Sequence, residues 1–256
     1  MIINPFANTN RSQESLDQAL ALSPLGAEFA HIPNPVTQFL ARELALVWHD
    51  FTQRLLTIPI VQKIENGTIT LEDYKILLIN LRQQVVEGAR WISRTASSME
   101  RNDLFPIRSA LIRHAADEHR DYQMLEKMYV GLGGEREDIL SRPRNIGTDA
   151  LTGYIFHQAS HPNPLNVLGA MFIIEGLGAT KAEQWGQALK VTLKLEDKDI
   201  LFMSYHSEHD ADEHYNMLRY ALTLPMIDQT VAMNIVKTAK VVGRLYCLQL
   251  EELDNY

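Results

Sequence analysis

Hydrophobic side chains recur every three or four residues along most of the chain beyond residue 35, which is the spacing of one apolar helix face. Strand patterns, in which valine or isoleucine alternates with polar residues, are missing. We therefore predict an all-α fold without a sheet. Helices are expected near residues 36–56, 59–65, 71–100, 106–131, 147–157, 164–190, 196–223 and 228–253.

Local signals mark several of the expected helix ends. Gly67 is placed to end one helix, and Thr70 with Asp73 forms the pattern of a capping box at the start of the next. The segment "GLGG" at 131–134 is expected to stop another helix, and "HPNP" at 161–164 precedes the most apolar one. The first 30 residues are polar and predict an N-terminal arm, followed by one helical domain over residues 31–256.

Composition narrows the class of protein. The net charge is −8 and hydrophobic residues make up 46% of the chain, which favours neither nucleic acid nor an anionic membrane as a partner. No apolar run approaches the roughly 20 residues that span a bilayer, and the first residues do not resemble a signal peptide. One cysteine, Cys247, excludes an internal disulfide and is expected in the core. We expect a cytoplasmic protein.

The segment 206–214, "HSEHDADEH", concentrates histidines and carboxylates in an otherwise amphipathic helix. At 100° per residue, His206 and Asp210 fall on the apolar face, together with either His214 or Glu213, while the remaining acids point outward. Burying ionisable groups costs several kcal/mol each unless they are paired or bind a metal. The pattern favours a set of metal ligands over a solvated charge run.

A second polar patch interrupts the apolar stripe of the helix expected at 106–131. His114, Glu118 and Asp121 occupy the middle of that stripe, with Tyr122 beside them. A buried salt-bridge network would produce the same pattern as a ligand set. Tyr122 is a candidate redox-active side chain, and the alternative is a packed core tyrosine.

Glu175 is the single charged residue in "VLGAMFIIEGLGA", residues 167–179. A helix this apolar is buried on most sides, so its carboxylate must be protonated, paired with an arginine or bound to a metal. Because two other inward polar patches exist, we expect all three to meet. Glu87 is a weaker candidate, because periodicity alone favours a surface position for it. Its spacing favours a ligand, since it precedes Glu118 by as many residues as Glu175 precedes His206.

Carboxylates with imidazoles and no cysteine suit iron or manganese better than structural zinc. Six or more candidate ligands predict two ions that share bridging carboxylates. Facing helices that project such ligands inward are the arrangement of helical dimetal sites.

The segment "IPIVQKIENGTITLEDYKILLINLRQQV" resembles haem-oxygenase-like proteins, which include the thiaminase II proteins, the pyrroloquinoline quinone synthesis protein C and the chlamydial death-domain-associating protein. The resemblance runs from about residue 36 to the C-terminus and implies a bundle of about seven to nine helices. The order of candidate ligands is similar to that of the haem-oxygenase-like diiron oxidases and oxygenases. It implies as metal ligands Glu87, Glu118, Glu175, His206, Asp210 and His214.

The chain departs from that family pattern at two positions. Asp121 stands where the family commonly has a histidine three residues after its second glutamate, and the last family histidine falls on Glu213 rather than His214. The resemblance therefore leaves His114 or Asp121 as a substitute ligand and Glu213 as an alternative to His214.

The resemblance implies an oxidase or oxygenase that holds two iron ions per chain, with manganese as the alternative metal. Dioxygen would be the co-substrate, a small organic molecule such as an amino acid or a fatty acid the substrate, and an external donor the source of electrons. A homodimer is possible for folds of this type. Two other hypotheses stay open, namely a metal-independent enzyme or binding protein of the same fold and a non-catalytic helical interaction protein.

Overall fold

The computed structural model describes residues 21, 23–25, 34–207 and 227–255, and every regular element in these ranges is helical. The prediction of an all-α fold is confirmed. Among the expected ligands, Asp210, Glu213 and His214 lie outside the described residues.

The elements are α2 (Pro35–Leu55), α3 (Pro59–Glu65), α4 (Leu71–Val85), α5 (Gly88–Ser97), α6 (Phe105–Glu118), α7 (Tyr122–Gly131), α8 (Arg136–Ser141), α9 (Ile146–Ala159), α10 (Leu168–Leu193) and α12 (Gln229–Glu251), with short 3-10 turns at Asn102–Leu104, Leu165–Val167 and Asp197–Asp199.

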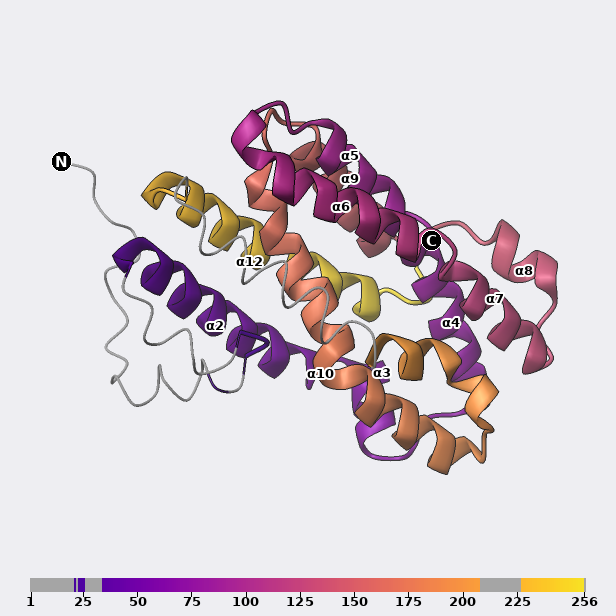
Figure 1. Ribbon diagram of the computed structural model, residues 1–256. Helices are drawn as coiled ribbons and strands as arrows, with labels where there is room; N and C mark the ends of the chain where they lie inside the picture. Colours follow the sequence, from indigo (N-terminus) through magenta and orange to yellow (C-terminus); the bar gives the residue numbers. More distant parts are fainter. Residues whose placement is uncertain (1–20, 22, 26–33, 208–226, 256) are drawn as a thin grey trace.

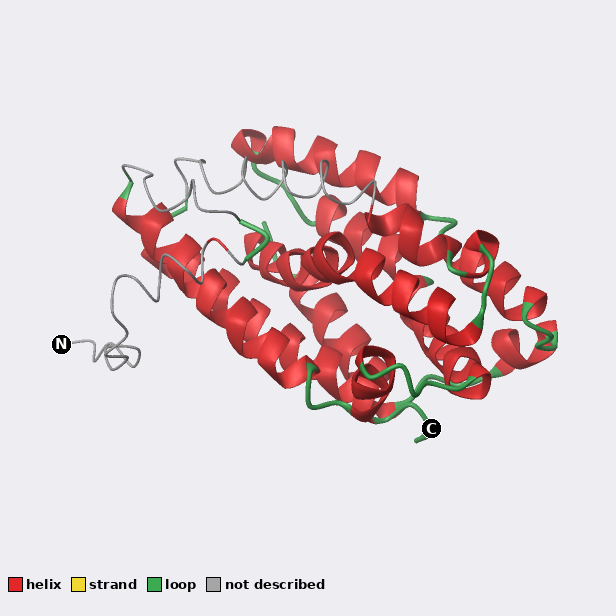
Figure 2. Cartoon of the chain, turned by 90° about the horizontal axis from the view of Figure 1, so that it is seen from below, coloured by secondary structure: helices red, strands yellow, loops and turns green. Residues whose placement is uncertain are grey.

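The helices form one bundle around α10 and α12 (Figures 1 and 2). Helix α12 packs against α2, α9 and α10, while α5 packs against α6 and α4 packs against α7. Gly169 allows the closest of these approaches, because a Cβ atom there would lie 2.2 Å from the backbone oxygen of Ile235 in α12. The backbones of α10 and α12 are therefore nearly in contact at this point.

Helix α10 is a core helix. Contrary to the expectation from the sequence, the span Leu165–Leu193 is long and apolar enough to cross a membrane by length and composition alone, but 67% of its most apolar window is buried within the fold. Burial on most sides explains why the first half of this helix has so few polar positions. The same burial keeps Glu175, in its first half, only 7% exposed.

Two long helices expected from the sequence are each broken in two. The helix expected at 71–100 stops at Val85 and restarts at Gly88, and that expected at 106–131 stops at Glu118 and restarts at Tyr122. The apolar stripe continues across each break, so periodicity does not reveal it. Both expectations of an unbroken helix were wrong. The short helix α8 was not expected either, since six residues are too few to show a period.

The local end signals were more reliable than the lengths. The Thr70 hydroxyl accepts from the Asp73 backbone N–H and the Asp73 carboxylate accepts from that of Thr70, which completes the expected capping box. Gly67 has a positive φ of 63° after α3, as a helix-ending glycine requires. Ahead of α2, Leu25 is fully buried, so part of the segment expected as an arm packs onto the bundle.

Candidate functional site

Five of the predicted ligands meet inside the bundle, and we call them the ligand cluster. They come from the last turns of α6, the break before α7, the first half of α10 and the helical segment 201–207. Together they form two groups of possible metal ligands that have one residue in common. The members of the ligand cluster are His114, Glu118, Asp121, Glu175 and His206.

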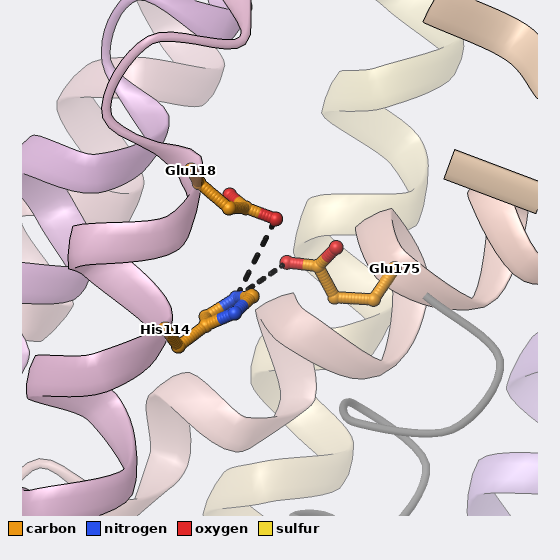
Figure 3. Close-up of side chains that lie close together, drawn as sticks. All are labelled: His114, Glu118 and Glu175. Carbon is orange, nitrogen blue, oxygen red and sulfur yellow. Dashed lines mark hydrogen bonds and ion pairs between the residues drawn. The ribbon is translucent and has the colours of Figure 1, made fainter. Parts of the chain in front are cut away.

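The first group joins α6 to α10. His114 Nε2 lies 3.4 Å from Glu175 Oε1 and 3.6 Å from Glu118 Oε1, and Figure 3 shows the three side chains pointing toward one another. His114 and Glu175 are 6% and 7% exposed, so the contact is shielded from solvent. The expectation that Glu175 meets the polar patch of α6 is therefore confirmed.

The second group contains Glu118, Asp121 and His206. Asp121 lies in the break between α6 and α7, and its Oδ2 is 3.6 Å from His206 Nε2. The imidazole of His206 packs against Phe202, with ring centroids 4.2 Å apart, and this contact helps to fix its direction. Glu118 thus stands between two sets of ligands, each with one imidazole and one further carboxylate.

The N-terminus of α5, which lies opposite α6, stabilises the negative charge of the Glu118 carboxylate. Gly88 is the first residue of α5, and a Cβ atom there would lie 3.5 Å from Glu118 Oε2. The carboxylate consequently faces the N-terminus of α5, where the helix dipole stabilises negative charge by about 0.3–1 kcal/mol. The break that the sequence did not predict is what brings this helix end to the site.

The cluster fits a pair of divalent ions. Ligand atoms held about 2.1 Å from one ion lie roughly 3.0–3.4 Å apart, close to the 3.4–3.6 Å seen here. Within each group, all offered atoms lie within 4.8 Å of one another. Oxygen and nitrogen donors without sulfur suit iron or manganese, and three clustered carboxylates repel one another unless a cation lies between them.

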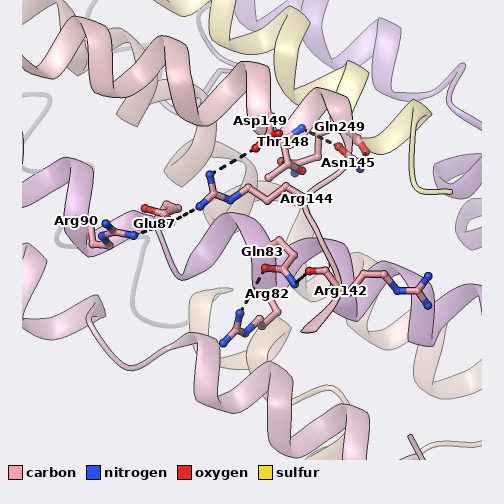
Figure 4. A network of polar contacts seen from close by, with 10 residues as sticks. All are labelled: Arg82, Gln83, Glu87, Arg90, Arg142, Arg144, Asn145, Thr148, Asp149 and Gln249. Carbon is pink, nitrogen blue, oxygen red and sulfur yellow. Dashed lines mark hydrogen bonds and ion pairs between the residues drawn. The ribbon is translucent and has the colours of Figure 1, made fainter. Parts of the chain in front are cut away.

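Glu87 lies elsewhere and has a different set of partners. Its carboxylate accepts from Arg144 at 2.6 Å and from Arg90 at 2.8 Å, at the break between α4 and α5 (Figure 4). It is 3% exposed, so it is not the surface residue that periodicity favoured. Glu87 belongs to neither group of possible ligands, and its role as a ligand stays a prediction.

Tyr122 also lies apart from the ligand cluster. It is half-buried at the start of α7, its ring lies 5.5 Å from the guanidinium carbon of Arg82, and both line a surface pocket with Glu126. The change of direction after Asp121 turns the neighbouring side chain away from the cavity. A redox role for Tyr122 stays a prediction that this placement does not favour.

A cavity of about 110 Å³ adjoins the ligand cluster. Its described lining includes Glu118, Asp121, Glu175 and His206 together with mostly apolar side chains of α3, α4 and α10. Tyr246 from α12 also lines it, and burial together with the nearby Glu175 carboxylate raises the pKa of this phenol above its usual value. Sequence reasoning missed Tyr246, because at 6% exposure it follows the same period as the packed core residues of α12.

Solved structures resemble this fold at low sequence identity. A domain of unknown function with a haem-oxygenase-like fold from Shewanella denitrificans aligns over 81% of this chain and 88% of its own, with 21% identity and a TM-score of 0.74. A TenA homologue from Pseudomonas syringae aligns over 84% and 92%, with 13% identity and a TM-score of 0.68. A TenA homologue from Pyrococcus furiosus aligns over 83% and 98%, with 16% identity and a TM-score of 0.63.

These likenesses establish the haem-oxygenase-like fold and nothing about activity. A search of curated proteins found no match. A family model described as "iron-containing redox enzyme" matches residues 78–246, a span that includes all five members of the ligand cluster. The chain therefore belongs to the haem-oxygenase-like family of iron-containing redox enzymes.

Proposed function

We propose that this protein is a non-haem diiron oxidase or oxygenase that uses dioxygen to oxidise a small organic molecule. The observation that carries the proposal is the position of Glu118 between two groups of ligands, His114 with Glu175 and Asp121 with His206. A shared carboxylate at this position is what a pair of bridged ions requires. Iron is proposed over manganese because the family is one of iron-containing redox enzymes.

Iron bound by these residues would supply the reducing equivalents that dioxygen needs. The residues of the chain orient and shield that chemistry. Glu118 would contribute to both sites, His114 and Glu175 would complete one, and Asp121 and His206 the other. The apolar side of the cavity keeps water from the bound substrate. An external donor would restore the reduced state, because the sequence has no dinucleotide or flavin fingerprint.

Thiol chemistry of the thiaminase II kind is not supported. The solved TenA homologues share the fold at 13–16% identity. The single cysteine, Cys247, is buried in the core, and burial raises the pKa of its thiol to about 12. A thiol that stays protonated is a poor nucleophile, and Cys247 is not among the described residues that line the cavity.

A purely structural role for the ligand cluster is also less favoured. An interaction protein would use these side chains as a buried network of ion pairs between carboxylates and histidines. The two groups share Glu118, and within each group the offered oxygen and nitrogen atoms lie within 4.8 Å of one another, which is a spacing that metal ligands adopt. Iron binding distinguishes the two hypotheses, because an ion-pair network needs no metal.

Anaerobic loading with Fe(II), followed by mixing with oxygenated buffer in a spectrophotometer, tests the proposal. The full-length protein is expected to develop a visible absorption band that depends on both iron and oxygen. Glu118→Gln is expected to remove this band. Glu126→Gln, which alters a buried carboxylate away from the cavity, is the matched control and should keep it. A wild-type protein that shows no oxygen-dependent band would refute the proposal.

A further inference from the structure

The cavity beside the ligand cluster combines an apolar wall with one hydroxyl group. The apolar part of the lining includes Ile64, Leu77, Leu81, Ile174 and Leu177, and we call it the apolar wall. No lysine or arginine occurs among the described residues that line it. A charged group that lay against this wall would be desolvated without a counter-ion, at a cost of several kcal/mol. The part of a ligand that lies against this wall is therefore uncharged.

Two polar side chains in the lining already have partners. Gln84 Oε1 accepts from Gln249 Nε2 at 2.8 Å, and Trp185 Nε1 donates to Glu65 Oε1 at 2.8 Å, outside the cavity. Tyr246 carries the single hydroxyl group among the described lining residues, and that hydroxyl has no hydrogen-bond partner in the described part of the chain. Buried phenols usually find such a partner.

The ring of Tyr246 is held firmly, which makes its hydroxyl a fixed donor. The ring packs edge-on against Phe51, with centroids 6.1 Å apart and an interplanar angle of 89°. A phenol hydroxyl carries its proton at neutral pH and can therefore donate. Tyr246 lines the same cavity as Glu175 and His206 of the ligand cluster.

We propose that the Tyr246 hydroxyl donates a hydrogen bond to an oxygen atom of an uncharged, mainly apolar substrate and so anchors it beside the ligand cluster. This inference rests on the proposed function for the identity of the site, but the binding it predicts does not need iron. A cavity of about 110 Å³ suits a molecule of roughly the size of benzene or a short alkyl chain, since an engineered cavity of about 150 Å³ binds benzene.

A matched pair of probes tests the anchor. Methyl butyl ketone offers an acceptor oxygen, and its hydrocarbon isostere carries a methylene group in place of that oxygen. Binding is measured by calorimetry and by the fluorescence of Trp91 and Trp185, which both line the cavity. The full-length chain is used both metal-free and after Fe(II) loading.

The variant Tyr246→Phe keeps the ring and removes only the hydroxyl. It is expected to lower the affinity for the ketone by about 2-fold to 10-fold, which corresponds to one hydrogen bond. The affinity for the isostere is expected to change by less than about 2-fold. Tyr154→Phe, on α9 and outside this cavity, is the matched control and should change neither. Ala182→Leu fills part of the cavity and should lower the affinity for both probes.

Other results would overturn the inference. They are failure of the ketone to bind the wild-type protein, equal affinity of the ketone for wild type and Tyr246→Phe, and binding of the hexanoate anion to the metal-free protein as tightly as the ketone. Because the metal-free arm requires no iron, a protein that binds the ketone but no iron would refute the proposed function alone. A protein that binds iron but not the ketone would refute the anchor alone.

Discussion

Replacing the Glu118 carboxylate by the amide of glutamine is expected to change the stability of the protein in opposite directions with and without iron. Glutamine keeps the size of the side chain and removes its charge. In the metal-free protein, Glu118 faces the carboxylates of Glu175 and Asp121. In the iron-loaded protein, the same carboxylate would hold both ions. A residue that serves binding rather than folding shows this reversal of sign.

The magnitude follows from the spacing of the charges. The ligand atoms of each group lie within 4.8 Å of one another, and two unit charges at that distance repel by roughly 3 kcal/mol at an effective dielectric constant of about 20. The Glu118 side chain is 17% exposed, so solvent screens part of this repulsion. We expect metal-free Glu118→Gln to be about 1–3 kcal/mol more stable than wild type, which corresponds to about 2–4 °C in Tm for each kcal/mol.

Thermal unfolding followed by circular dichroism measures both effects, with and without Fe(II) under anaerobic conditions at pH 8. Wild-type protein should gain about 2.7 kcal/mol for each site when free iron is 100 times Kd, and Glu118→Gln should lose most of that gain. The control Glu126→Gln breaks a salt bridge to Arg82. It should lower stability and leave the gain from iron unchanged. A metal-free Glu118→Gln protein that is less stable than wild type would refute the reasoning and favour a structural ion-pair network.

Three further predictions concern other parts of the chain. Gly169→Ala should destabilise the protein by about 1–3 kcal/mol in urea unfolding, because its Cβ would lie 2.2 Å from a backbone oxygen of α12. The control Gly153→Ala meets nothing within 4 Å and should stabilise the protein by about 0.5–1 kcal/mol. Equal effects of the two substitutions would contradict the close approach of α10 to α12. Cys247 should resist alkylation at pH 8 in the native state, and rapid labelling of the native protein would contradict this. The pKa of the thiol is higher in the folded than in the unfolded state, so the stability that the protonated thiol contributes should fall as pH rises from 9.0 toward about 12. Glu87→Gln and Arg144→Met should each lower the free energy of unfolding by about 1–3 kcal/mol. A double-mutant cycle should show that the two residues stabilise each other, because the double variant loses less stability than the sum of the single variants. Full additivity of the two losses would exclude the ion pair.

Local signals in the sequence predicted much of the fold. The bounds expected for Pro59–Glu65 agree with the structure, and the capping box of Thr70 with Asp73 sets the start of α4 as expected. Signals of this kind depend on a few adjacent residues, and their physical basis is present in any context. The apolar surroundings of Glu175 were equally informative, because a single charge in a buried helix needs a partner wherever that helix packs.

The rest depends on contacts between distant segments. Periodicity does not show that α4 and α6 end where they do, since the apolar face continues across each break. The break before Tyr122 decides that Asp121 faces the cavity while Tyr122 faces Arg82. One of the two arginine partners of Glu87, Arg144, precedes α9 and is distant in sequence, so no local pattern links it to Glu87.

The number of iron ions bound per chain, measured in wild-type protein and in two variants, tests the central claim most directly. Anaerobic Fe(II) titration of the full-length protein should give two ions per chain if Glu118 is shared between two sites, as the two groups of ligands predict. Asp121→Asn should retain about one ion, because only one of the groups contains Asp121. Glu118→Gln should weaken both sites. Binding of two ions that is unaffected by Glu118→Gln would contradict the account.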